Sequence, residues 1–169
     1  MTAAEKKDIR FDDDFVLVVD DDQTDYAPII GMIDDLHKMR AASFFRYLLN
    51  WKPYTDASTV RLRSLVRRIA TDNETRMQEL ADLLAEFCTT HSGAMFKPDM
   101  ADANYTDWKN LLFRLVETQH QIVQAQTNAL SAMTGCLGEH QARPAIQKHL
   151  ANDSKNLTDL QSWSSALAN

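Results

Sequence analysis

The chain has 169 residues, of which only 4 are glycine and 4 are proline. Sheet-containing folds need many turns, so this scarcity argues against all-β and α/β organisations and favours a few long helices. The formal net charge of −6 at pH 7 disfavours nonspecific binding to nucleic acid or to anionic membranes. No stretch approaches the roughly 20 apolar residues of a membrane span, and the polar N-terminus does not resemble a secretory signal. We therefore expect an all-α cytoplasmic protein with no nucleic-acid partner and no membrane span.

The negative charge is concentrated at the N-terminus. Residues 1–25 hold nine acidic and three basic residues, so the remaining 144 residues, 26–169, balance at 15 of each. We predict that 1–25 is an acidic, partly disordered arm and that 26–169 is a single bundle domain. The apolar run at 15–19 predicts a segment that packs on the bundle or pairs with another chain. The acidic arm is also a candidate site for an unidentified protein partner.

Apolar residues recur with the 3.6-residue period of an amphipathic helix in four parts of the chain. Proline cannot continue a helix, so Pro53 ends the first of them. Pro144 suits the first turn of the last one. The predicted helices span residues 27–51, 57–91, 106–134 and 142–167.

The connection between the second and third predicted helices is long. An up-down bundle needs only about 2–8 residues between neighbouring helices, whereas residues 92–104 provide 13. That many extended residues reach at most about 45 Å, which is about the length of a 30-residue helix. We therefore predict that this segment crosses the length of the bundle and places the second and third helices parallel.

Two stretches carry a resemblance to a known family. IATDNETRMQELADLL at 69–84 is similar to the second-helix pattern in which Glu-x-x-His precedes a run like A-E-E-L-A-E-L-L, and LANDSKNLTDL at 150–160 is a fainter likeness. On these residues, and over roughly 27–167, the chain resembles bacterial ferritin-like bundle proteins related to rubrerythrin and bacterioferritin. The resemblance implies a four-helix bundle of antiparallel hairpins with one long crossover between its second and third helices.

The family's metal ligands do not carry over. A di-iron carboxylate site takes one Glu from each of two helices and Glu-x-x-His from each of the other two. The matching pairs here are Asn73-x-x-Arg76 and Asp153-x-x-Asn156, and Arg40 falls where the first-helix Glu would lie. A guanidinium is always charged and only donates hydrogen bonds. The resemblance without its ligands implies a metal-free bundle, without catalytic or cofactor-binding residues, that acts as a structural or protein-interaction module.

The polar residues in the middle of the helices predict a buried network in place of a metal site. A buried arginine without a partner costs several kcal/mol, so an inward-pointing Arg40 or Arg76 requires Asp153 as its counter-ion. The alternative is that both arginines snorkel outward, with their charged ends in solvent. The predicted network comprises Arg40, Asn73, Arg76, Asp153, Asn156 and either Glu117 or Gln119.

A displaced metal site is the main functional alternative. Three pairs of residues have a helical spacing that brings a carboxylate and an imidazole onto one face. They predict a site for iron or manganese in a di-metal oxidoreductase or a storage protein, although such pairs also occur as solvated charges that stabilise helices slightly. The six candidates are Asp34, His37, Glu117, His120, His149 and Asp153.

Surface features predict self-association. Four aromatic residues exceed what one bundle seam requires, so we expect a second apolar face and a homodimer; they are Phe44, Phe45, Trp108 and Trp163. The first half of the second helix carries Arg61, Arg63, Arg67 and Arg68, which form either a solvated face or a site for an acidic partner, including the protein's own arm. The Gln- and Ala-rich third helix suggests a further alternative, a phasin-like protein that binds an apolar surface.

Overall fold

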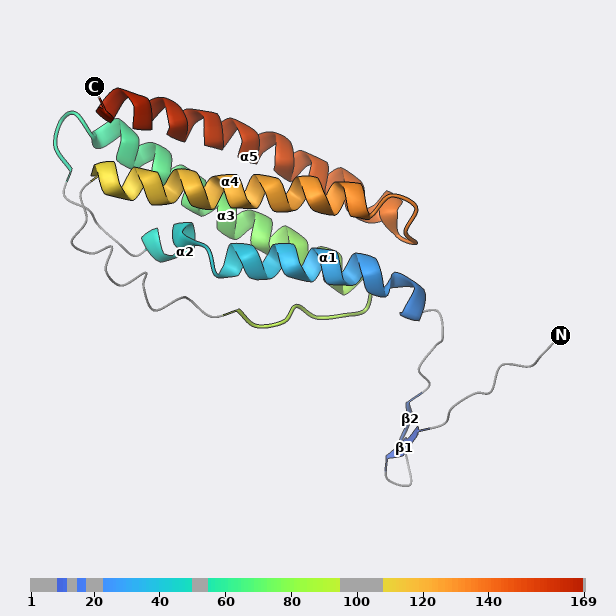
Figure 1. Cartoon of the computed structure of the whole chain (residues 1–169). Helices are drawn as coiled ribbons and strands as arrows, with labels where there is room; N and C mark the ends of the chain where they lie inside the picture. The colour runs from blue at the N-terminus through green and yellow to red at the C-terminus, as the bar shows by residue number, and fades with distance from the viewer. Residues whose placement is uncertain (1–8, 12–14, 18–22, 50–54, 95–107, 169) are drawn as a thin grey trace.

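The computed structural model describes residues 9–11, 15–17, 23–49, 55–94 and 108–168. Their helices are α1 (Gln23–Ala41), α2 (Phe44–Leu48), α3 (Val60–Glu86), α4 (Trp108–Ala132) and α5 (Glu139–Ala168). Two short strands, β1 (Ile9–Phe11) and β2 (Phe15–Leu17), pair antiparallel with Ile9 opposite Leu17. The described chain is thus almost entirely helical, and the prediction of an all-α class is confirmed (Figure 1).

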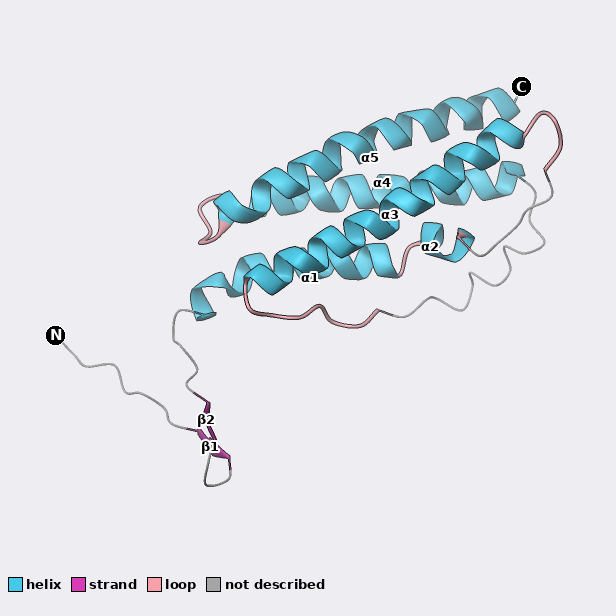
Figure 2. Ribbon diagram, turned by 180° about the vertical axis from the view of Figure 1, so that it is seen from behind, coloured by secondary structure: helices cyan, strands magenta, loops and turns pink. Residues whose placement is uncertain are grey.

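The four long helices pack side by side in one bundle. α1 and α5 run in one direction and α3 and α4 run in the other (Figures 1 and 2). None of the described helices combines the length and the apolar character needed to cross a bilayer. Most of the predicted crossover (95–104) lies outside the described residues, as do 1–8, 12–14 and 18–22 of the predicted arm.

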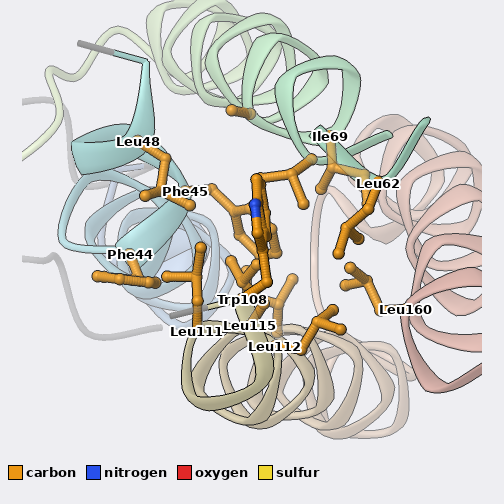
Figure 3. Close-up of a cluster of buried hydrophobic side chains, with 13 residues drawn as sticks. Phe44, Phe45, Leu48, Leu62, Ile69, Trp108, Leu111, Leu112, Leu115 and Leu160 are labelled. Atoms are coloured by element: carbon orange, nitrogen blue, oxygen red, sulfur yellow. The ribbon is translucent and has the colours of Figure 1, made fainter. Parts of the chain in front are cut away.

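The apolar core forms two clusters at opposite ends of the bundle. The first joins α2 and the starts of α3 and α4 to the end of α5 (Figure 3). The second joins α1 and the ends of α3 and α4 to the start of α5. This division leaves the middle of the bundle to polar residues. The first cluster contains Phe44, Phe45, Leu62, Leu112, Leu115 and Leu160, and the second contains Ile29, Ile33, Leu80, Leu84, Met133 and Ile146.

The prediction of a second, exposed apolar face is wrong. Phe44, Phe45 and Trp108 are buried in the first cluster, and Trp163 packs against it. These aromatic residues fit inside one bundle because α2 adds a short extra element to this end of the core (Figure 3).

The first predicted helix is divided, so its prediction as one continuous helix is wrong. α1 ends at Ala41, Ser43 is extended (φ −72°, ψ 152°), and α2 begins at Phe44. The side-chain amide of Asn73 donates to the Arg40 carbonyl at 3.3 Å and to the Ser43 hydroxyl at 3.2 Å. A residue of α3 therefore satisfies groups that the break exposes, which is a tertiary contact that apolar periodicity does not reveal.

The other helices differ from prediction only at their ends. The Asp56 carboxylate accepts from the backbone N–H groups of Ser58 and Thr59, both at 2.9 Å, which holds a turn before α3 begins. α3 ends at Glu86, and two residues later Cys88 has a φ of +54°. Gly135 and Gly138 have φ of +80° and +83° and form the turn between α4 and α5. Such left-handed positions favour glycine because they crowd a Cβ.

Candidate functional site

A buried ionic layer lies between the two apolar clusters. Its centre is Asp153 of α5, which is 1% exposed. The Arg40 guanidinium of α1 donates from Nη2 to Asp153 Oδ2 at 2.6 Å, and Arg76 of α3 donates from Nη1 to Oδ1. Arg40 is 2% exposed and Arg76 is 7% exposed. Both arginines point inward, as one of the two predicted arrangements has it, and one carboxylate serves both.

Two glutamines of α4 complete the environment of this carboxylate. Gln119 Nε2 donates to Asp153 Oδ1 at 3.0 Å and to the Asp153 carbonyl at 3.1 Å. Gln126 Nε2 donates to Oδ2 at 2.9 Å. Each carboxylate oxygen thus accepts one guanidinium and one amide. Asn73 adds a second contact to Arg40 by accepting from its Nη1 at 3.2 Å. The layer comprises Arg40, Asn73, Arg76, Gln119, Gln126 and Asp153.

The layer keeps its charges despite its burial. Burial acts to raise the pKa of the Asp153 carboxyl, but the two guanidinium groups and the hydrogen bonds from Arg40 and Gln119 hold that pKa below its ordinary value. Burial also lowers the pKa of Arg40, and Asp153 opposes that change. A guanidinium starts so far above neutral pH that it stays protonated. Two cations therefore share one anion, and Asp72 lies 3.8 Å from Arg76 Nη2 as a further acid.

His149 lies beside the layer on α5. It is 1% exposed, and its Nε2 lies 2.5 Å from Glu79 Oε2. Because a carboxylate oxygen accepts hydrogen bonds, the Nε2 proton points toward Glu79. Burial lowers the pKa of His149, and the nearby charges of Arg40 and Arg76 lower it further against the effect of Glu79. The imidazole is therefore neutral at neutral pH and serves as a donor to Glu79. Lys148 binds the other Glu79 oxygen at 3.1 Å.

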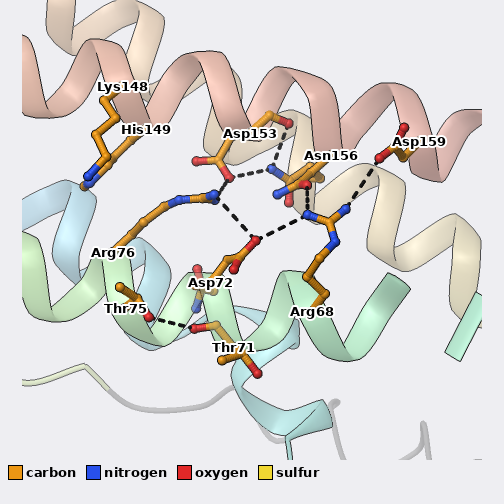
Figure 4. A network of polar contacts seen from close by, with 12 residues as sticks. Arg68, Thr71, Asp72, Thr75, Arg76, Lys148, His149, Asp153, Asn156 and Asp159 are labelled. Atoms are coloured by element: carbon orange, nitrogen blue, oxygen red, sulfur yellow. Dashed lines mark hydrogen bonds and ion pairs between the residues drawn. The ribbon is translucent and has the colours of Figure 1, made fainter. Parts of the chain in front are cut away.

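Asn156 belongs to a neighbouring polar set. Its Oδ1 accepts from Arg68 Nη1 at 3.2 Å, and Arg68 also lies 3.4 Å from Asp72 and 3.5 Å from Asp159. Figure 4 shows Arg68 and Arg76 reaching from α3 toward this side of α5. Within the described chain, Asn156 Nδ2 has no hydrogen-bond partner. Asn156 is 1% exposed but does not contact the Asp153 carboxylate through a described hydrogen bond.

The placement of Glu117 in the network is wrong. Glu117 is exposed on α4 and accepts from Gln121 Nε2 at 2.8 Å, while Gln119 takes the inward position. Two residues along a helix correspond to a rotation of about 200°, so Glu117 and Gln119 face opposite sides of α4. Gln126 was absent from the prediction. Gln126 lies two helical turns after Gln119, and this spacing, which places both amides on one face of the helix, is the sequence pattern that indicates it.

The six candidate metal ligands do not converge on one point. Asp34 accepts from the Ser92 backbone N–H at 2.7 Å and from its hydroxyl at 2.8 Å, and forms an ion pair with Lys38 at 2.8 Å. His37 is 4% exposed and stacks on His91 with ring centroids 4.2 Å apart. The described residues contain no group of three or more His, Cys, Asp or Glu arranged to hold a metal ion. Glu117 and His120 are exposed on α4, while His149 and Asp153 take part in the contacts described above.

No family model matches the chain, and neither a curated protein nor a solved structure matches it. Any functional conclusion must therefore come from the geometry and chemistry of the ionic layer and of the helix surfaces around it.

Proposed function

We propose that this chain is a structural or protein-interaction module built as a ferritin-like four-helix bundle, with an ionic layer at the level where metal-binding ferritin-like proteins hold their di-metal centre. The module carries out no metal chemistry. Its long helices present surfaces to other chains, and the ionic layer fixes how the helices align. The observation that carries this proposal is the set of four donors on the Asp153 carboxylate, two guanidinium and two amide.

The donor set does not fit a divalent cation. A ligand for Fe²⁺ or Mn²⁺ must offer an oxygen or nitrogen lone pair that no other group uses. Both oxygens of Asp153 are occupied, and the nearest cationic groups are Arg40 and Arg76. A metal ion entering this layer would have to displace a guanidinium and face the repulsion of two positive charges. The di-metal oxidoreductase or storage alternative therefore lacks a ligand set at the centre of the bundle.

The helix directions support the ferritin-like topology. With α3 and α4 running the same way, the end of α3 and the start of α4 lie at opposite ends of the bundle (Figure 1). The same arrangement follows from the clusters, because the starts of α3 and α4 lie in the first cluster and their ends lie in the second. These helix directions agree with the one-crossover connection that we propose, as in ferritin-like bundles.

The phasin-like alternative depends on an apolar face of α4 that is available to a surface. That face packs inside the bundle, where Leu111, Leu112, Leu115, Ile122 and Met133 are buried. The glutamines that suggested this alternative are divided between the ionic layer and the solvent-exposed side of α4.

Metal analysis tests the proposal directly. The protein is expressed in medium supplemented with iron and manganese, purified without chelators, and measured for both metals by elemental analysis. We expect far less than one ion per chain. An occupancy of about two ions per chain would overturn the proposal, because a di-metal enzyme or storage protein retains that number. An Asp153→Asn variant analysed in parallel shows whether any bound metal depends on the ionic layer.

A further inference from the structure

The charges on α3 are separated along the helix. Its first half carries the exposed arginines Arg61 and Arg67, and its second half carries the exposed acids Asp82 and Glu86. The first turn contains no acid and the last turn no base. A helix has partial positive charge at its N-terminus and partial negative charge at its C-terminus, so this order destabilises an isolated helix. The arrangement therefore needs an explanation outside α3 itself.

These charges are not used inside the described chain. The side chains of Arg61, Arg67 and Glu86 form no hydrogen bond or ion pair with other described residues. Asp82 accepts only from its helical neighbour Gln78, at 2.8 Å. In contrast, Arg68 and Glu79 on the same helix are held by partners on α5. Among the exposed charged side chains of α3, two cations at one end and two anions at the other therefore have no partner on another described helix; Arg63, also without a partner there, is half-buried.

The unpaired charges lie along a common face. At about 100° per residue, the four charged side chains fall within an arc of about 120°, with Arg61 and Glu86 toward one edge, Asp82 in the middle and Arg67 at the other edge. Between them lie the small exposed residues Ser64, Thr71 and Thr75. Each hydroxyl donates to the backbone carbonyl four residues earlier, at 3.1, 3.1 and 3.3 Å. The centre of the face therefore carries only small side chains whose hydroxyl groups already have hydrogen-bond partners, which allows a second helix to approach closely. Figure 2 shows α3 on the outer side of the bundle.

We propose that α3 is a self-association surface, on which a second copy of this chain packs its own α3 antiparallel. A two-fold axis near the middle of α3 brings Arg61 opposite Glu86 of the partner subunit and Arg67 opposite Asp82 of the partner subunit. Symmetry repeats both pairs, so four ion pairs form. The positive half of each helix then lies against the negative half of the other. This inference rests on the proposed role as an interaction module and names its partner.

The association is weak and depends on salt. Exposed ion pairs contribute little individually and are screened at high ionic strength. The face lacks large apolar side chains along its centre, so electrostatic complementarity sets its orientation and specificity. We expect a reversible dimer whose dissociation constant rises steeply between about 50 mM and 0.5 M NaCl.

Charge reversal with cross-complementation tests the surface. One variant combines Arg61→Glu with Arg67→Glu, and the other combines Asp82→Arg with Glu86→Arg. Sedimentation equilibrium of the full chain at low salt should show a dimer for the unaltered protein, and a dissociation constant raised at least tenfold for each variant alone. An equimolar mixture of the two variants should regain dimers, because all four pairs are again opposite in sign. Circular dichroism checks that each variant keeps its helical content.

Arg63→Glu is the matched control. It alters the same charge on the same helix, but Arg63 is half-buried and points about 100° from the line of Ser64, Thr71 and Thr75, whereas Arg61 and Arg67 point about 60° from that line. Its dissociation constant should stay within about twofold of that of the unaltered protein. A protein that is monomeric throughout the concentration series, or dimers that both double variants leave unchanged, would overturn this inference. Either result leaves the metal analysis, and with it the proposed function, untouched.

Discussion

Replacing Asp153 by asparagine should severely destabilise the bundle. The change keeps the size of the side chain but removes its charge, and it turns one acceptor oxygen into a donor. That donor then faces guanidinium and amide groups that themselves only donate toward this position. Arg40, at 2% exposed, cannot reach solvent to recover its hydration.

The magnitude follows from the burial of the layer. Breaking a buried ion pair by removing one partner costs about 3–5 kcal/mol, because the remaining charge is left uncompensated. Two buried arginines lose one shared counter-ion here, so the upper part of that range applies. With about 4–5 kcal/mol lost, and a melting temperature that falls by about 2–4 °C per kcal/mol in a domain of this size, the expected decrease is about 8–20 °C. Typical domains have only about 5–15 kcal/mol of stability in total.

Urea unfolding followed by circular dichroism at 222 nm measures the effect. The control is Asp159→Asn, which removes a carboxylate on the same helix from an exposed arginine pair at 3.5 Å. That change should cost less than about 1 kcal/mol. If Asp153→Asn costs no more than the control, the buried-charge account is refuted. A chain with Arg40→Met, Arg76→Met and Asp153→Leu together should be far more stable than the single variant, because it buries no charge at all.

Three further outcomes are expected. Burial lowers the pKa of His37 and of His149 below 6.5, helped by nearby His91 for His37 and by nearby arginines for His149. As pH falls, the unfolded chain therefore takes up these protons before the folded chain does. The free energy of unfolding measured by urea titration should decrease below about pH 6.5, and decrease less in a His149→Gln variant. Gly138→Ala should cost more than Gly135→Ala in melting temperature, because both residues have positive φ but only at Gly138 would a Cβ lie 2.8 Å from a Phe87 ring carbon. Asn73→Ala should cost about 1–3 kcal/mol in the same urea assay, and a neutral result would contradict its role in holding the break between α1 and α2.

The helical class could be predicted from sequence, and the inward arginines were one of the two arrangements that the sequence left open. Scarce glycine and proline indicate long helices, and a mid-helix arginine on an apolar seam requires a buried counter-ion. Asp153 was the one carboxylate at a matching level of the fourth helix, so its pairing with Arg40 and Arg76 followed.

The remaining features depend on contacts between distant residues. The break before Phe44 is held by the side-chain amide of Asn73 on α3, and no local sequence pattern predicts this contact. Glu117 and Gln119 were alternative members of the predicted network, and the uncharged Gln119 takes the inward position because helix rotation decides which of the two side chains faces the core. The four aromatic residues assigned to a second face instead lie in or against the first apolar cluster, to which α2 contributes, and sequence periodicity merges α2 with α1.

The divided first helix has a consequence for motion within the bundle. α2 packs in the first apolar cluster and α1 in the second, so the two segments are anchored at opposite ends. Ala42 and Ser43 join them without a continuous ladder of helical hydrogen bonds. Loosening at one end is therefore not transmitted along a rigid rod to the other. Amide exchange in the two segments should accordingly report separate opening events with different free energies, as expected for distinct cooperative units.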